Sequence, residues 1–377
     1  MTAKKSTAIG PLTDVVVVDF SRMLPGAVLA RQLIDLGARL IKVEDPAGGD
    51  PMRAAPPMVG GVGAGFATLL RGSESVCLDL RSESGAIAAR RLAASADVVI
   101  ESFRPGTAKR WGLDPESLTT TNPGIVFCSL SSYGWQNPWA DQVGHDLNFV
   151  AASGLLSLLP GNGVPAVQLA DVTVALVATS AILAALLSRQ RSGRGAVLEQ
   201  PLASAPLPFL AWAWADAAAG GAGVLDVLLA GNAPCYRRYH CADGLELAVA
   251  AIEPKFWAGF LEMLELPHLA DAGFDPGEEG RRAAAEIGQA LAKRPRSHWL
   301  EQATNRRIPV SAVNDLSTAR QEGPYSLPQV EEKIMTPDGA SLRGVAPWIA
   351  GGRTPAGAAP ALGEHTEAVL EELGISF

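Results

Sequence analysis

The sequence predicts an α/β protein with a large parallel-sheet domain and a smaller α+β domain, and three observations support this fold class. The chain has 377 residues, which is enough for two ordinary domains. Residues 1–130 alternate short runs of β-branched residues with segments of helical periodicity, which is typical of a parallel sheet covered by helices. The composition changes near Gly220–Gly223, where we expect the smaller domain to begin.

The large domain begins with a βαβ unit. Val15–Asp19 predicts a strand buried on both faces, Ala27–Leu36 predicts a helix that ends at Gly37, and Leu40–Glu44 predicts the next strand. The same alternation continues with strands at Ser75–Leu80, Asp97–Glu101, Ile125–Ser129 and Ala196–Gln200, and with helices at Ser84–Ala94 and Val172–Arg189. Ligands of such sheets bind at the carboxyl ends of the strands, so we expect the site there.

The smaller domain is predicted to span residues 223–329. Its expected elements are strands at Tyr236–Cys241 and Leu245–Val249 and helices at Pro254–Leu264, Glu279–Lys293 and Ser297–Asn305. Asp338 followed by Gly339 is typical of a hairpin turn, and Thr366–Leu373 predicts a closing helix. We therefore expect a large domain of residues 1–222 that is completed by residues 330–377.

Charge and hydropathy exclude several classes of partner. The net charge is −8 and no block of Lys and Arg occurs, which argues against a general nucleic-acid binder. The longest apolar stretch, Val172–Leu187, is shorter than the roughly 20 residues that a membrane span needs. The N-terminal segment has no apolar region typical of a secretory signal. We expect a cytoplasmic protein that binds neither nucleic acid nor membrane.

Motifs of several common enzyme classes are missing from the sequence. It contains no GxxxxGK[ST], no GxSxG and no HExxH, so a P-loop NTPase, an α/β-hydrolase and a zinc hydrolase lose their main support. The four cysteines, Cys77, Cys128, Cys235 and Cys241, stand singly, which fits reduced thiols better than disulfides or a zinc site.

Three residues are candidates for chemistry, although each also has an ordinary structural explanation. His145 follows a glycine in a loop beyond the strand at Ile125–Ser129, and Asp171 stands at the start of the apolar helix. Glu253 precedes the helix predicted at Pro254–Leu264. Carboxylates at helix starts often serve only as caps, and a single histidine is often structural. Spacing alone does not bring these three residues together.

Longer strings in the sequence carry a resemblance to a known family. They include Leu24-Pro25-Gly26, Ile41-Lys42-Val43-Glu44, Glu101-Ser102-Phe103-Arg104-Pro105-Gly106, Gly144-His145-Asp146-Leu147-Asn148-Phe149, Ile252-Glu253-Pro254 and Leu362-Gly363-Glu364-His365-Thr366. With these strings in family order, the chain resembles the family III CoA-transferases, also called the CaiB/BaiF family. Within that family it is most similar to the α-methylacyl-CoA racemases.

The resemblance implies an enzyme that acts on acyl-CoA thioesters. It implies a Rossmann-like large domain, a smaller domain and an interlocked homodimer. In the racemase branch the residues that match His145 and Asp171 are the acid/base pair, and the residue that matches Glu253 orients the histidine. Inversion of a carbon beside a thioester needs one group on each face to remove and return a proton. No metal and no prosthetic group are expected, and CoA enters as part of the substrate.

A CoA-transferase is the alternative that the resemblance leaves open. In that branch the residue matching Asp171 attacks the thioester and carries the acyl group and then CoA as covalent intermediates. His145 favours the racemase, because transferases usually have another residue there. Asp171-Val172-Thr173-Val174-Ala175 lacks the glycine-rich run of racemases and is closer to transferase sequences. A catalytically inactive CoA-binding subunit is a third reading.

For CoA itself, the resemblance implies contacts from five residues. Lys42, Arg104 and Arg110 would bind phosphate or nucleotide groups, Phe103 would lie against the adenine, and Arg71 is assigned less securely. An acidic protein must concentrate such cations locally to bind an anionic ligand. Each of these cations also has the alternative of an ordinary solvated side chain.

Overall fold

The structure is a computed structural model, which describes residues 10–159, 161, 163–220, 230–327, 329–349 and 357–375. The chain divides into two compact units. The large unit comprises Met1–Leu156, Val164–Leu207 and Leu327–Phe377, and the small unit comprises Ser157–Gly163 and Pro208–Ser326. In this division residues 208–220 group with the small unit, whereas the sequence assigns them to the large domain. The domain boundaries drawn from the sequence stay a prediction.

A six-stranded parallel sheet forms the centre of the large unit, in the order β5-β2-β1-β6-β7-β8. The strands are β1 (Val16–Asp19), β2 (Arg39–Glu44), β5 (Glu74–Cys77), β6 (Val98–Glu101), β7 (Val126–Ser129) and β8 (Ala196–Glu199). Their order reverses between β1 and β6, which is the Rossmann arrangement and places a ligand crevice at that point. The parallel sheet predicted from the sequence is confirmed, and each strand lies where it was expected.

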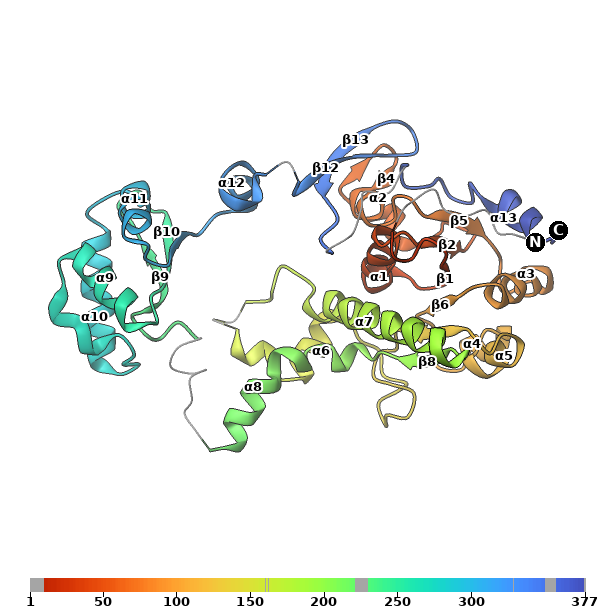
Figure 1. The fold of residues 1–377 in the computed structure, drawn as a ribbon, viewed down its shortest axis with the longest axis horizontal. Coiled ribbons are helices and arrows are strands. Elements are labelled where there is room, and N and C mark those ends of the chain that lie inside the picture. Colours follow the sequence, from red (N-terminus) through yellow and green to blue (C-terminus); the bar gives the residue numbers. More distant parts are fainter. Residues whose placement is uncertain are drawn as a thin grey trace. The chain divides into compact units, whose positions relative to one another are not determined.

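Helices cover both faces of this sheet (Figure 1). On one face, α3 (Glu83–Ala94), α5 (Pro115–Thr121) and α13 (Thr366–Glu372) share a core with the buried strand residues. On the other face, α1 (Met23–Asp35) packs against α7 (Leu169–Ser192), and α7 packs against β7 and β8. The remaining helical segments of this unit are η1 (Pro51–Ala54), α2 (Ala64–Leu69), α4 (Thr107–Trp111), α6 (Asp146–Ala152) and η3 (Leu202–Ser204), and the division between the units falls within η2 (Leu155–Leu158).

Helix α7 is long and apolar enough to cross a membrane by length and composition alone. Its packing explains its composition instead. Ala170, Val174, Ala178 and Ile182 are buried at successive turns, and the helix contacts α1 and α6. Helix α7 is therefore a core helix of the large unit.

The C-terminal segment returns to the large unit. Strands β12 (Glu331–Met335) and β13 (Ser341–Val345) form the hairpin predicted at Asp338-Gly339. Further along, the N–H of His365 donates to the carbonyl of Ser75 at 2.9 Å, and Thr366 accepts from the N–H of Cys77 at 3.0 Å. These bonds attach the end of the chain to the outer strand β5. A second short hairpin, β3 (Met58–Val59) with β4 (Val62–Gly63), precedes α2.

The small unit has an antiparallel sheet of order β11-β10-β9. The strands are β9 (Tyr236–His240), β10 (Glu246–Ala250) and β11 (Val310–Ala312). One apolar core joins this sheet to α9 (Pro254–Leu264), α10 (Glu278–Leu291) and α11 (Arg296–Arg306), with Trp257, Phe260 and Ile287 fully or almost fully buried. The other helical segments are α8 (Leu207–Ala218), η5 (Pro267–Ala272), α12 (Leu316–Gln321) and η6 (Gly323–Tyr325).

Candidate active site

Two of the three candidate residues lie at the starts of two helices that pack together. His145 is the N-cap residue of α6, and Asp171 lies in the first turn of α7. Helices α6 and α7 are in contact within the large unit. The N–H of His145 donates to Oδ1 of Asn148 at 3.0 Å, and the N–H of Asn148 donates back to the carbonyl of His145 at 2.8 Å. The backbone of the candidate histidine is therefore fixed.

The two side chains differ in exposure, and this difference has electrostatic consequences. The imidazole of His145 is exposed, whereas Asp171 is only 8% exposed. Burial first, and then the nearby charge of Asp146, together raise the pKa of Asp171 to about 6, against the opposing effects of His145 and of a hydrogen bond from Gln168. A carboxyl group with this pKa can both give and accept a proton near neutral pH.

Asp146 connects the starts of these two helices. Its Oδ1 accepts hydrogen bonds from the N–H of Ala170 at 2.6 Å and from the N–H of Asp171 at 3.0 Å. N–H groups at the start of a helix can stabilise the oxygen of an enolate. Because Asp146 already accepts from two of them, an enolate would need other donors.

Three aromatic residues that flank His145 in sequence, Tyr133, Trp139 and Phe149, pack together and form an apolar wall. The ring of Tyr133 makes edge-to-face contacts with Phe149 at 5.3 Å and with Trp139 at 5.7 Å between centroids. Gly144 lies so close that a Cβ atom there would come within 3.0 Å of the Phe149 ring. A side chain at this position would require the Phe149 ring to shift by a few tenths of an ångström.

Glu253, the third candidate, belongs to the small unit. It is the N-cap residue of α9 and is exposed. Its carbonyl accepts from the N–H groups of Phe256 and Trp257, and its side chain makes no cap hydrogen bond. Its role in orienting His145 stays a prediction.

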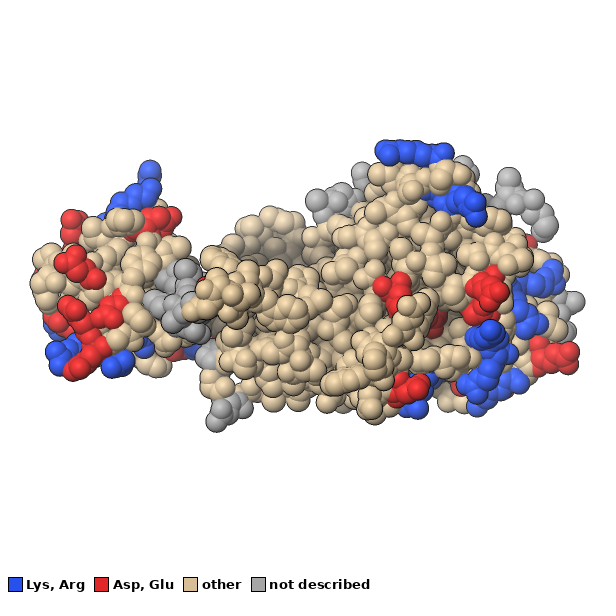
Figure 2. All heavy atoms as spheres, turned by 90° about the horizontal axis from the view of Figure 1, so that it is seen from below, with Lys and Arg blue, Asp and Glu red and all other residues tan. Residues whose placement is uncertain are grey.

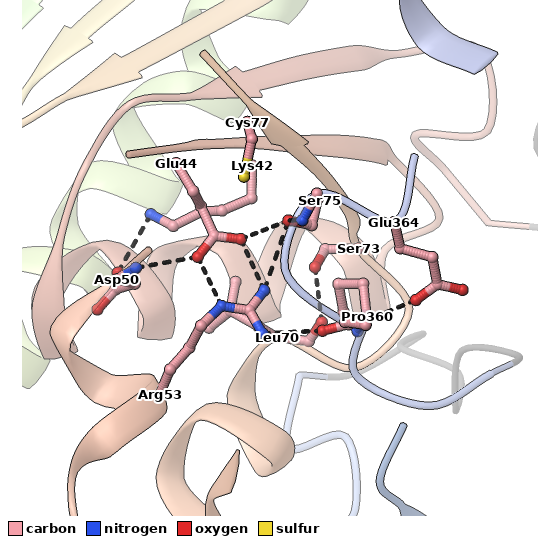
Figure 3. A network of polar contacts seen from close by, with 12 residues as sticks. Lys42, Glu44, Asp50, Arg53, Leu70, Ser73, Ser75, Cys77, Pro360 and Glu364 are labelled. Carbon is pink, nitrogen blue, oxygen red and sulfur yellow. Dashed lines mark hydrogen bonds and ion pairs between the residues drawn. The ribbon is translucent and has the colours of Figure 1, made fainter. Parts of the chain in front are cut away.

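Lys42, expected at the CoA phosphates, is buried inside the large unit (Figure 3). Its Nζ pairs with Asp19 at 3.0 Å and with Asp50 at 3.5 Å, and it donates to the carbonyl of Ser21. Burial by itself would lower the pKa of Lys42, but Asp19 and Asp50 outweigh burial, and the pKa is raised. Lys42 is thus a charged member of an interior ion-pair network.

The same network holds the C-terminal segment (Figure 3). Glu44 accepts two hydrogen bonds from Arg53, both at 2.7 Å, and one from Ser75 at 2.6 Å. Arg53 also donates to the carbonyl of Pro360 at 3.0 Å, and Ser75 accepts from the N–H of Gly363 at 2.9 Å. A group of charged residues at the end of β2 therefore supports the fold.

Arg71, the less secure CoA candidate, is also buried. Its guanidinium pairs with Glu332 of β12 and donates to the carbonyls of Thr68 and, at 3.2 Å, Val345. Burial first, and then the neighbouring Arg31, together lower the pKa of Arg71 to about 10, against the opposing effect of Asp35. In this structure Arg71 binds the C-terminal hairpin.

A pocket of about 170 Å³ opens at the carboxyl ends of β1, β2, β5 and β6. Phe103 and Trp111, in edge-to-face contact at 5.1 Å, form its aromatic wall. Its charged lining is Arg22, Glu44, Asp45, Asp79 and Arg81. Neither Lys42 nor Arg71 lines it. The pocket lies where ligands of such sheets bind, and its aromatic wall fits a flat base.

Two arginines of this pocket, Arg22 and Arg81, were not identified from the sequence. Each follows closely after a strand end, β1 and β5 respectively, so the rule that ligands bind at carboxyl ends of strands could have identified them. Arg81 is exposed and binds Asp79 at 2.8 Å and Asp45 at 3.6 Å.

Arg104 and Arg110 are both exposed, and each is next in sequence to a residue that lines this pocket, Phe103 and Trp111 respectively. Arg110 donates to the hydroxyl of Thr107 at 3.2 Å, and neither arginine makes an ion pair within the described residues. Figure 2 shows Lys and Arg side chains gathered at the end of the large unit that carries α3 and α4.

Within the described part of the chain, no group of His, Cys, Asp or Glu is arranged to hold a metal ion.

Comparison with known proteins identifies the family. The model of CoA-transferase family III matches residues 12–366. The chain is 31% identical to "Alpha-methylacyl-CoA racemase" of Mus musculus (97% of this chain, 94% of the relative) and 30% identical to "Succinate--glutarate CoA-transferase" of Agrobacterium fabrum (96% of each).

A solved structure of a CaiB/BaiF family protein from Brucella suis has a similar fold. Its TM-score is 0.83 at 28% identity, and the match covers 97% of this chain and all of that one. The matches to the family model, to the racemase and to this structure agree over nearly the whole chain. The protein therefore belongs to CoA-transferase family III.

Proposed function

We propose that the protein is an acyl-CoA racemase or epimerase that inverts the α-carbon of a 2-methyl-branched acyl-CoA by two-base proton transfer. The observation that carries this proposal is that His145 and Asp171 stand at the starts of two helices in contact. The imidazole and the carboxyl group interact electrostatically.

The pKa of Asp171 supports its part in this chemistry. Racemisation needs a base on one face of the α-carbon and an acid on the other, and the two roles exchange when the other enantiomer reacts. With its pKa raised to about 6, Asp171 is a better proton donor to a carbanion-like intermediate at neutral pH than an ordinary carboxyl group. His145 supplies the second group, and the role of Glu253 in orienting it is carried over from the family resemblance alone.

The CoA part of the substrate is assigned to the pocket at the carboxyl edge of the sheet. The adenine would lie against Phe103 and Trp111, and the phosphates would meet Arg104 and Arg110 together with Arg22 and Arg81. The exposed arginines support this assignment, because binding them to phosphate breaks no interior ion pair.

The molecule is further proposed to be an interlocked homodimer in the cytoplasm. Helix α8 supports the dimer, because Phe209, Trp212 and Trp214 are each more than half exposed along it. Exposed aromatic side chains in such a group mark an interaction surface. The four cysteines are free thiols, which fits a reducing compartment. Sedimentation at twice the chain mass is the expected result.

Deuterium exchange tests the proposed reaction. Incubation with a 2-methylacyl-CoA in D₂O should place deuterium at the α-carbon and convert either enantiomer to a mixture of both. His145→Ala and Asp171→Asn should each lower the racemisation rate at least about 100-fold, because general acid–base groups typically contribute this much or more. Absence of exchange with every 2-methylacyl-CoA offered would exclude the racemase.

A CoA-transferase remains the second candidate, because transferase relatives match at an identity close to that of the racemases. In this reaction the Asp171 carboxylate attacks the thioester carbonyl, forming a mixed anhydride and releasing the CoA thiolate. The thiolate then attacks the Asp171 carbonyl of the anhydride, which releases the donor carboxylate and leaves an enzyme–CoA thioester, and an acceptor carboxylate takes the CoA through a second anhydride. Incubation with acyl-CoA and hydroxylamine should then convert Asp171 to a hydroxamate. Labelling without α-deuteration would establish the transferase, and CoA binding without either signal would indicate an inactive subunit.

A further inference from the structure

We propose that Asp146 is a positioning residue of the reaction: its carboxylate holds the first turn of α7, and with it Asp171, in a fixed place beside His145. The inference rests on the proposed function, in which His145 and Asp171 exchange protons with the substrate. Asp146 itself receives no proton from the substrate in this account.

The hydrogen bonds of Asp146 replace a cap that α7 lacks. The first N–H groups of an α-helix have no acceptor within the helix. The N-cap residue of α7, Gln168, makes no side-chain cap hydrogen bond. Asp146 supplies the missing acceptor from another helix, with Oδ1 at 2.6 Å from the Ala170 nitrogen and at 3.0 Å from the Asp171 nitrogen.

The position of Asp146 in its own helix couples the two catalytic groups. Asp146 is the first residue of α6 and directly follows His145, whose backbone is held by Asn148. A single carboxylate therefore joins the residue next to the imidazole to the backbone of the acidic partner. A displacement of either helix start would change the separation of the two groups, and misplacement by about 1 Å can cost about 100-fold in rate.

Asp146 also contributes charge to the site. Beyond the effect of burial, its carboxylate raises the pKa of Asp171, and His145 lowers it. Other charged groups packed around α7 are engaged elsewhere: Arg31 and Asp35 of α1 pair with each other. Glu199 of β8 accepts from Ser131 and Trp135, and η3 (Leu202–Ser204) carries no charge.

Two substitutions separate the hydrogen bonds from the charge. Asp146→Asn keeps a side-chain oxygen that can accept from both N–H groups but removes the negative charge. Asp146→Ala removes both. Asp141→Asn is the matched control, since it removes a charge from an exposed residue of the same loop.

The expected result is a graded loss of racemase activity. Asp146→Ala should lower kcat at least about 10-fold with KM little changed, which is the pattern of lost positioning. Asp146→Asn should keep kcat within about threefold at its best pH, and the part of its pH–rate profile governed by Asp171 should move to lower pH. Asp141→Asn should match wild type. Wild-type kcat and pH profile in Asp146→Ala would overturn the proposal.

A stability measurement tests the electrostatic effect of Asp146 on Asp171 without an activity assay. Asp171→Asn should increase resistance to urea at about pH 8, because it removes a disfavoured buried charge. This gain should be smaller when Asp146 is already Asn, because the repelling carboxylate has gone. An equal gain in both backgrounds would overturn the electrostatic part of the proposal. If wild-type protein shows no α-deuterium exchange, the proposed function fails, whereas this cycle still tests the coupling of Asp146 to Asp171.

Discussion

Two groups of cationic side chains in the large unit differ in burial and in their partners. Lys42 and Arg71 are buried and bind carboxylates of the protein itself. Arg104 and Arg110 are exposed near the pocket that Phe103 and Trp111 line. A buried cation would lose its carboxylate partners on binding a phosphate. Arg104 and Arg110 make no ion pair within the described residues, and Arg110 would give up a hydrogen bond to Thr107. The comparison teaches that the partners of a cation, which a motif does not reveal, determine what it would lose on binding a ligand.

The largest effect is expected at Lys42. Lys42→Met would leave Asp19 and Asp50 buried without their cation, so it should lower the free energy of unfolding by about 3–5 kcal/mol. Urea unfolding followed by circular dichroism measures this change. Arg110→Met is the matched control and should change stability by less than about 0.5 kcal/mol. If Lys42→Met keeps wild-type stability and raises the KM for acyl-CoA, Lys42 is a CoA-binding residue and not a structural one.

A smaller effect, of opposite sign, is expected at Asp171. The ordinary pKa of an aspartate side chain is 3.8, and the pKa of Asp171 in the folded protein is about 6, so folding disfavours its charged form. The resulting loss of stability is absent below about pH 4 and complete above about pH 6. Asp171→Asn should therefore stabilise the protein by on the order of 2 kcal/mol at about pH 8 and hardly at all at about pH 4. Equal urea midpoints for wild type and Asp171→Asn at both pH values would show that folding does not disfavour the charged form of Asp171.

The smallest effect on stability is expected at the exposed arginines. Arg104→Ala and Arg110→Ala should each raise the KM for acyl-CoA about 3- to 10-fold, because one charge-assisted contact to phosphate is lost. Their unfolding curves should stay within about 0.5 kcal/mol of wild type. Arg282→Ala, which removes an exposed ion pair with Glu278 in the small unit, is the control for loss of charge. An unaltered KM in both variants would move the phosphates away from this edge.

Most of the large unit could be predicted from the sequence, for a physical reason. Strands buried on both faces read as continuous apolar runs, such as Val15–Asp19, and the glycine at position 37 marks the end of the helix before β2. The hairpin at Asp338-Gly339 could be predicted for the same reason, because its turn depends on two adjacent residues. These features depend only on neighbours in the chain.

The ion-pair partners could not be predicted in this way, because they come from distant parts of the sequence. Nothing near Lys42 indicates that Asp19 will face it from another strand, and nothing near Arg71 points to Glu332. The same reason hides the contact of Asp146 with Ala170 and Asp171, which spans a loop between two helices. The residues of the candidate site were visible in the sequence, but the groups that hold them were not.

Exchange measured separately for each enantiomer tests the central claim most directly. If His145 and Asp171 act on opposite faces of the α-carbon, His145→Gln and Asp171→Asn should each retain deuterium exchange with one enantiomer and lose it with the other, in opposite senses. Both variants should fail to racemise either substrate. Loss of exchange from the same enantiomer in both variants, or full racemisation by either one, would contradict the two-base account.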